Sequence, residues 1–358
     1  GFRFGAGAVT NSKLSEKYKV AFYGAYGLKD NEFKYGITPS YLAHKSSETW
    51  VSASYTDDIS EIAQTNFVTD SRRFKIYDPR RINISTFYNN RMSSVFVESK
   101  FLPKTTSYFG VSHNQIQPLF DYTFVNDEKS YTNYNITAVQ LAFQWNPFSN
   151  YMQTPIGKIE YEKRHPKFSL QLTQTLPGVL ENDFAFSKID FKTFYELPYL
   201  SGQKSSVLLQ TGIAFGDVPI THLYSIVPNN LNREAILQRV TFAGKNSFET
   251  MYFNEFFSNQ YASLQLKHTF NKIRLGYKIN PEFTIVTRMA VGYDNHNNQH
   301  LGITYKTMED GFFESGVECN KIYKGIGLVA FYRYGPYQLA NFDDNIAVKI
   351  SYHLDLGL

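Results

Sequence analysis

The final stretch, Asn345-Ile-Ala-Val-Lys-Ile-Ser-Tyr-His-Leu-Asp-Leu-Gly-Leu358, decides how the rest of the sequence is interpreted. Every second side chain is apolar, and charged, hydroxyl or imidazole groups stand between them. A repeat of two residues places the two sets on opposite faces of a β-strand. At roughly 12 residues, such a strand is long enough to cross a bilayer at a tilt. A long edge strand of a soluble sandwich has the same pattern, but a transmembrane barrel is favoured.

The two faces of this strand are predicted residue by residue. In a membrane barrel the apolar face meets lipid and the polar face lines the lumen. The predicted lumen-facing residues are Lys349, Ser351, His353 and Asp355, and the predicted lipid-facing residues are Val348, Ile350, Tyr352 and Leu354.

The composition agrees with a barrel and argues against a helical membrane protein. The chain has 358 residues, a mean hydropathy of −0.35, and no apolar run near the ~18 residues that a transmembrane helix needs. Aromatic residues make up 17% of the chain, and the aromatic girdles of a barrel use many of them. Charged residues make up 19%, below the roughly 25% of soluble domains.

Several other classes are disfavoured. The single cysteine, Cys319, excludes an internal disulfide. The net charge of +4 is too small to indicate nucleic-acid binding. No sequence motif indicates a cofactor, so we expect none.

Alternating segments separated by polar turns continue along the chain. They predict an all-β protein, an antiparallel up-and-down transmembrane barrel of about 14 strands, within a range of roughly 12 to 16. We expect residues 1–358 to form one outer-membrane barrel domain, with irregular insertions near 57–90 and 216–259.

The first insertion, 57–90, lacks sustained alternation and contains Asp57-Asp58 and two arginine pairs. We interpret it as a long connection that can plug the lumen. The arginines proposed to line such a plug are Arg72, Arg73, Arg80 and Arg81.

The second insertion, 216–259, contains a helix-like piece from Leu231 to Val240. A helix packed on the barrel rim and an element of a plug explain this piece equally well. Arg233, Asn254 and Glu255 are the candidate plug or lumen residues here.

Three blocks of sequence resemble a known family: Gly1–Gly5 with Gly27–Gly36, Asn254–Leu264, and Asn298–Gly316. They are similar to an uncharacterised outer-membrane barrel family of the Bacteroidota. Its full-length members are expected to carry a carboxypeptidase-regulatory-like β-sandwich before the barrel, and we expect residues 1–358 to contain the barrel without that sandwich. The resemblance implies the outer membrane of a Gram-negative bacterium and a barrel fold. It implies no catalytic residues.

A search for chemistry finds weak candidates only. Ser112-His113-Asn114 is the most suggestive hydrolase cluster, but adjacent strand residues point to opposite faces. Asp294, His296 and His300 have donor types that bind metal, although a solvated turn explains this Asn-rich stretch better. We therefore expect no enzymatic activity, no catalytic residues and no metal site.

The function that follows is a non-enzymatic barrel subunit or scaffold of an envelope complex for outer-membrane assembly, export or uptake. A channel or porin for small solutes is the alternative, and an outer-membrane enzyme is the third possibility. The expected partners are outer-membrane lipids, lipopolysaccharide and other envelope proteins. If both chain ends lie in the periplasm, the long insertions are expected on that side or inside the lumen.

Overall fold

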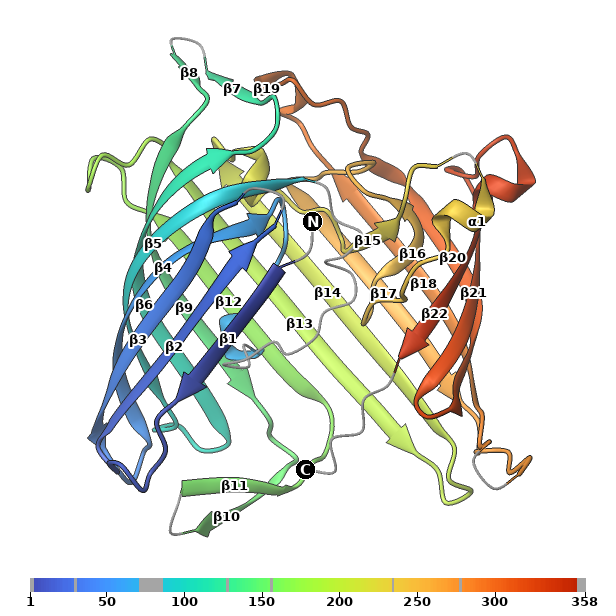
Figure 1. Ribbon diagram of the computed structural model, residues 1–358, viewed down its shortest axis with the longest axis horizontal. Coiled ribbons are helices and arrows are strands. Elements are labelled where there is room, and N and C mark those ends of the chain that lie inside the picture. Colours follow the sequence, from blue (N-terminus) through green and yellow to red (C-terminus); the bar gives the residue numbers. More distant parts are fainter. Residues whose placement is uncertain are drawn as a thin grey trace.

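Fifteen strands form one continuous antiparallel sheet in the computed structural model (Figure 1). The structure describes residues 3–28, 31–70, 86–126, 129–154, 157–233, 235–276 and 279–352. Along the sheet, the strands are β1 (Arg3–Val9), β2 (Tyr18–Gly27), β3 (Phe33–His44), β4 (Thr49–Glu61), β5 (Phe87–Ser99), β6 (Thr105–Pro118), β9 (Tyr134–Trp145), β12 (Lys167–Thr175), β13 (Phe186–Pro198), β14 (Lys204–Gly216), β17 (Gln260–Thr269), β18 (Glu282–Tyr293), β20 (Met308–Tyr323), β21 (Ile326–Tyr334) and β22 (Ile346–Tyr352).

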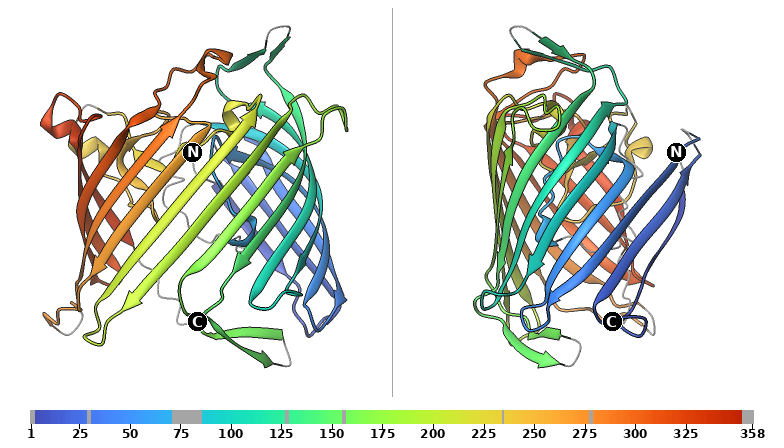
Figure 2. Two further views of the ribbon diagram at one scale, coloured as in Figure 1. Left: turned by 180° about the vertical axis from the view of Figure 1, so that it is seen from behind. Right: turned by 90° about the vertical axis from the view of Figure 1, so that its left-hand side faces the viewer.

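The sheet curves into a barrel-like wall but does not close (Figures 1 and 2). Neighbouring strands are antiparallel, so the first and fifteenth strands, β1 and β22, run in the same direction. The all-β class, the antiparallel meander and a strand number within the expected range are confirmed.

Alternation along the strands gives the sheet an apolar outer face. On β3, for example, Phe33, Tyr35 and Ile37 are exposed, whereas Lys34 and Gly36 between them are buried. Aromatic pairs stand on the outer face near both ends of the strands, such as Tyr18–Tyr41 at one end and Tyr26–Phe33 at the other. An apolar band between two aromatic belts is the surface pattern of a membrane barrel.

The two ends of the sheet differ in the length of their connections. The short-turn rim consists of the connections 10–17, 45–48, 100–104, 146–166, 199–203, 270–281 and 324–325. The long-connection rim consists of 28–32, 62–86, 119–133, 176–185, 217–259, 294–307 and 335–345. Because the strand number is odd, β1 begins at the long-connection rim and β22 ends at the short-turn rim. The premise that both ends of the barrel sequence lie on one side is therefore wrong for the described strands.

Three small sheets and several short helical turns are separate from the main sheet in the described residues. The small strands are β7 (Thr123–Asn126), β8 (Lys129–Tyr131), β10 (Asn150–Thr154), β11 (Gly157–Glu162), β15 (Pro228–Asn230), β16 (Phe248–Tyr252) and β19 (His300–Leu301). The helical turns are η1 (Val68–Asp70), η3 (Ile220–His222), α1 (Ile236–Arg239), η4 (Asn297–Gln299) and η5 (Phe342–Asn345). In the described part of the chain, no helix has the length and apolar character needed to span a membrane.

The first irregular insertion is shorter than expected, and the second is less helical than expected. Strand β4 runs on to Glu61 and β5 begins at Phe87, because the acidic pair that resembles a loop is neutralised across strands. Asp57 pairs with Arg91, and Asp58 pairs with Arg3. The expected helix over 231–240 is a single turn, since Ala235 has an extended backbone and delays its start to Ile236.

Candidate functional site

Residues 217–259, here called the inner segment, lie against the inner face of the sheet (Figures 1 and 2). Its two short strands, β15 and β16, pair in parallel, and β16 contacts β21 and β22. All of Phe248–Thr250 and most of the surrounding side chains are buried. The inner segment therefore fills space that an open barrel would leave to water.

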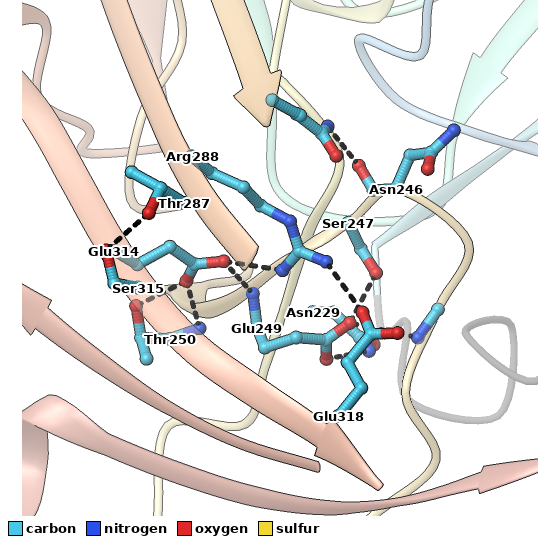
Figure 3. Close-up of polar contacts among 12 residues, drawn as sticks. Asn229, Asn246, Ser247, Glu249, Thr250, Thr287, Arg288, Glu314, Ser315 and Glu318 are labelled. Atoms are coloured by element: carbon cyan, nitrogen blue, oxygen red, sulfur yellow. Dashed lines mark hydrogen bonds and ion pairs between the residues drawn. The ribbon is translucent and has the colours of Figure 1, made fainter. Parts of the chain in front are cut away.

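A buried ion pair fastens β16 to the wall (Figure 3). Arg288 of β18 and Glu314 of β20 are 2.7 Å apart, with 1% and 0% of their side chains exposed. The Glu314 carboxylate also accepts the backbone N–H groups of Glu249 and Thr250 at 3.1 and 2.9 Å. The Thr250 hydroxyl donates to it at 2.7 Å. One carboxylate thus joins the wall to the backbone of the inner segment.

A second buried pair lies beside the first. Lys349 of β22 is 3.7 Å from Glu249, with 0% and 1% of the side chains exposed. The Lys349 ammonium also donates to the Asn229 carbonyl. The Glu249 carboxylate accepts hydrogen bonds from the Asn229 amide and the Ser247 hydroxyl, both at 2.7 Å. Buried charges need such partners because desolvation costs several kcal/mol per ion.

A third contact secures the end of the inner segment. Arg333 of β21 donates two hydrogen bonds to Glu255, at 2.8 and 3.0 Å. Its guanidinium lies 4.8 Å from the centre of the Phe312 ring. Because the planar guanidinium matches the carboxylate, the two hydrogen bonds fix the orientation of the Glu255 side chain as well as its distance from Arg333.

An aromatic wedge seats the beginning of the inner segment. The Tyr224 hydroxyl donates to the buried Asp190 of β13 at 2.7 Å. Gly212 on β14 permits this approach, because an added Cβ would lie 2.7 Å from the Tyr224 ring and 2.7 Å from the Tyr261 ring.

Residues 62–70, the inner connection, also enter the concave side. Ala63 and the inner segment exchange backbone hydrogen bonds, to Thr221 and from Ser225, each at 3.0 Å. Farther along, Asp70 forms an ion pair with Lys192 of β13. The two long connections therefore support each other against the wall.

A three-stranded sheet of β19, β7 and β8 joins two connections of the long-connection rim. The Tyr122 hydroxyl contacts His300 Nδ1 at 2.9 Å and accepts the Ile220 N–H at 3.0 Å. This links the small sheet to the inner segment. Burial lowers the pKa of His300 to about 4, although the nearby Asp294 carboxylate opposes that shift.

The predicted plug residues fall in different places. Arg72, Arg73, Arg80 and Arg81 lie outside the described residues. Arg233 is exposed to solvent. Asn254 donates a hydrogen bond to Thr86, and Glu255 binds Arg333 as described above.

The last strand divides into two faces. Lys349 and Ser351 are buried on the inner side, whereas Val348 and Tyr352 are exposed on the outer side and Ile350 is half-buried. His353, Leu354 and Asp355 lie outside the described residues.

The sequence search missed Arg288, Glu314, Arg333 and Glu249, which form the centre of the site. A charged residue at an inward-facing position of a strand was the only feature of the sequence that could have indicated Arg288, Glu314 and Arg333. In Glu282–Tyr293, Arg288 stands among apolar and hydroxyl residues with the period of a strand. Their partners, however, come from segments distant in sequence.

The residues considered as catalytic or metal-binding candidates do not come together in the structure. Ser112 accepts a hydrogen bond from Asn114, whereas His113 contacts Thr137 instead. In the described part of the chain, no group of three His, Cys, Asp or Glu side chains is placed to hold a metal ion.

Comparison with known proteins places this chain among barrel proteins. No curated protein matches the sequence. The fold is similar to the crystal structure of BamA from Haemophilus ducreyi lacking POTRA domains 1–3, with a TM-score of 0.58 and 12% identity over 97% of this chain. The match covers 66% of that structure, and the likeness concerns the fold alone. A family model for the C-terminal domain of a family of unknown function, DUF5686, matches residues 1–280. The chain therefore belongs to the DUF5686 C-terminal domain family.

Proposed function

We propose that this protein is an integral β-barrel of the outer membrane of a Gram-negative bacterium. The support is the apolar outer face of the sheet, bounded by aromatic pairs near both rims. A BamA-like fold agrees with that location. Origin in the Bacteroidota and a β-sandwich domain ahead of the barrel remain predictions of the sequence resemblance.

Crossing a bilayer requires that the edges of the sheet be satisfied, because unpaired backbone groups are costly in lipid. Strands β1 and β22 are the edges of the sheet and run in the same direction. Part of the β22 edge is already covered, because Ile350 exchanges backbone hydrogen bonds with Thr241 and Ala243 of the inner segment. The proposal therefore includes a seam in the membrane that satisfies the rest of both edges.

Within that location, a non-enzymatic subunit or scaffold of an envelope complex is the function the geometry supports best. The observation that carries it is the inner segment, fastened through the buried Glu314 carboxylate. A segment held inside the barrel by three sets of ion pairs occupies the space through which a solute would have to pass. A scaffold gains rigidity from it, and the assembly, export or uptake complex supplies the activity.

A small-solute channel is the alternative. The inner wall of β1–β4 favours it, because Arg3 and Asp58 form an ion pair there with 30% and 18% of their side chains exposed. Part of the inner wall is thus polar and accessible. An outer-membrane enzyme has less support, since Ser112 and His113 have separate partners on opposite faces.

Purification of the native protein in a mild detergent tests the scaffold. The proposal predicts stoichiometric outer-membrane or periplasmic proteins that stay bound through two separation steps. A protein that purifies alone and conducts ions at a steady level in planar bilayers contradicts it and supports the channel.

A further inference from the structure

The turns of the short-turn rim combine exposed apolar side chains with cations. The long-connection rim also exposes apolar side chains, such as Leu180, Leu237 and Phe342, so the cations are what distinguish the short-turn rim. The tip residues are Leu14, Phe101, Phe148, Leu200 and Leu275, and Leu200 and Leu14 are the most exposed large apolar side chains among them. These side chains come from five different connections.

Cations stand beside these apolar tips. Lys13 precedes Leu14, Lys104 follows Phe101 within the same turn, and Arg274 precedes Leu275. The exposed cations of this rim that have no carboxylate within ion-pair distance among the described residues include Lys13, Lys104, Lys163, Lys272, Arg274 and Lys324. They lie on five different connections around the rim, so they do not converge on one pocket.

The opposite rim has the reverse charge. Its exposed acidic residues include Asp121, Glu181, Asp183, Glu309, Asp310 and Asp343. Among the described residues, the short-turn rim therefore exposes mainly cations, whereas the long-connection rim exposes more acidic residues than basic ones. A rim of apolar and cationic tips fits a flat partner that has negative charge above an apolar layer.

We propose that the short-turn rim is a docking surface for anionic phospholipid headgroups. This inference rests on the membrane location proposed above. Lysine and arginine near an anionic leaflet gain about 1 kcal/mol each, and their stems lie along apolar surface while the charge reaches the headgroups. The exposed leucine and phenylalanine tips enter the acyl boundary beside them. Short turns of membrane barrels face the periplasm, so the phospholipid leaflet is the source of these headgroups.

The test compares matched charge reversals in nanodiscs. The rim variant is Lys13→Glu/Lys104→Glu/Lys324→Glu, and the control is Lys129→Glu/Arg233→Glu/Lys306→Glu on the long-connection rim. Both change the net charge equally. Protein is reconstituted in phosphatidylcholine containing phosphatidylglycerol, and the lipid that remains with the protein after partial delipidation is quantified. A cation at an anionic surface contributes roughly a five-fold preference.

The expected result is several-fold enrichment of phosphatidylglycerol by the native protein and the control, and its loss in the rim variant. Equal enrichment in all three proteins overturns the proposal. A parallel series with lipopolysaccharide distinguishes the source: stronger retention of lipopolysaccharide through the same cations contradicts the commitment to phospholipid. Retention of an acidic protein in place of lipid by those cations also overturns it. Failure of the native protein to enter nanodiscs at all counts against the membrane location itself.

Discussion

The inner face of the sheet has two walls that differ in how far their ion pairs are exposed to water. On the wall of β1–β4, Arg3 and Asp58 form an ion pair whose side chains keep 30% and 18% of their exposure. On the wall of β17–β22, Arg288 and Glu314 form an ion pair of similar length with 1% and 0% exposure. The chemistry is the same, and the difference is the inner segment that covers the second wall.

This difference teaches which charges determine the architecture. An exposed pair exchanges one set of water contacts for another and contributes little. A buried pair has lost its water, so removal of one partner leaves an uncompensated charge. The covered wall therefore depends on every member of its network, whereas the uncovered wall tolerates change.

The largest expected effect is at the buried carboxylate. Glu314→Ala removes the nearer carboxylate partner of the buried Arg288, which keeps only the 3.7 Å contact with Glu318, and frees two backbone N–H groups of the inner segment. We expect a loss of about 3–5 kcal/mol in the free energy of unfolding, measured by urea titration in detergent micelles. The double variant Arg288→Met/Glu314→Leu should recover part of it, and a double variant as unstable as the single one would contradict this account.

A smaller loss is expected at the end of the inner segment. Arg333→Ala removes two hydrogen bonds to Glu255, which keeps 10% of its side-chain exposure and can regain water. We expect the free energy of unfolding to fall by about 2–3 kcal/mol, because two charge-assisted hydrogen bonds are lost. Limited proteolysis should then cut near 252–256 faster than in the native protein. An unchanged cleavage pattern would show that Glu255 does not hold the segment.

Acid should loosen the small sheet above the inner segment. The pKa of His300 is lowered to about 4 in the folded protein, against about 6.5 in the unfolded chain. The neutral imidazole thus contributes stability that is present above pH 6.5 and is lost as the pH falls through 4. Between pH 7 and pH 5 the loss should be about 2 kcal/mol.

Urea titrations at both pH values provide the measurement. His300→Phe should make the stability less dependent on pH over this interval by the same amount. If the native protein and the variant respond equally to acid, His300 is not the group that titrates.

The smallest effect is expected on the uncovered wall. Asp58→Asn removes the ion pair with Arg3, where both partners remain hydrated. We expect a loss of less than about 1 kcal/mol in the free energy of unfolding, and added salt should reduce this loss further because it screens exposed charges. A loss as large as that of Glu314→Ala would remove the contrast between the two walls.

The strands were more predictable than their contacts. Alternation defined Tyr134–Trp145 and Ile326–Tyr334 to the residue. It failed for Asp57 and Asp58, whose charges are neutralised by Arg91 on the adjacent β5 and by Arg3 on β1, contacts that a linear sequence does not show.

The site was harder to predict for the same reason. The segment Phe248–Tyr252 is short and buried on all sides, so no alternation distinguishes it. Glu249 meets Lys349, a hundred residues away along the chain. Lys349 was identifiable as an inward-facing residue of the last strand, but its partner depends on where a long connection folds back.

Ion conductance of the purified protein in planar lipid bilayers tests the central claim most directly. If the inner segment blocks the lumen through its buried ion pairs, the native protein shows no steady conductance, and Glu314→Ala shows frequent openings as the segment detaches. Asp58→Asn, the control on the uncovered wall, stays silent. Steady conductance by the native protein, unchanged in Glu314→Ala, would contradict the claim that the inner segment blocks the lumen.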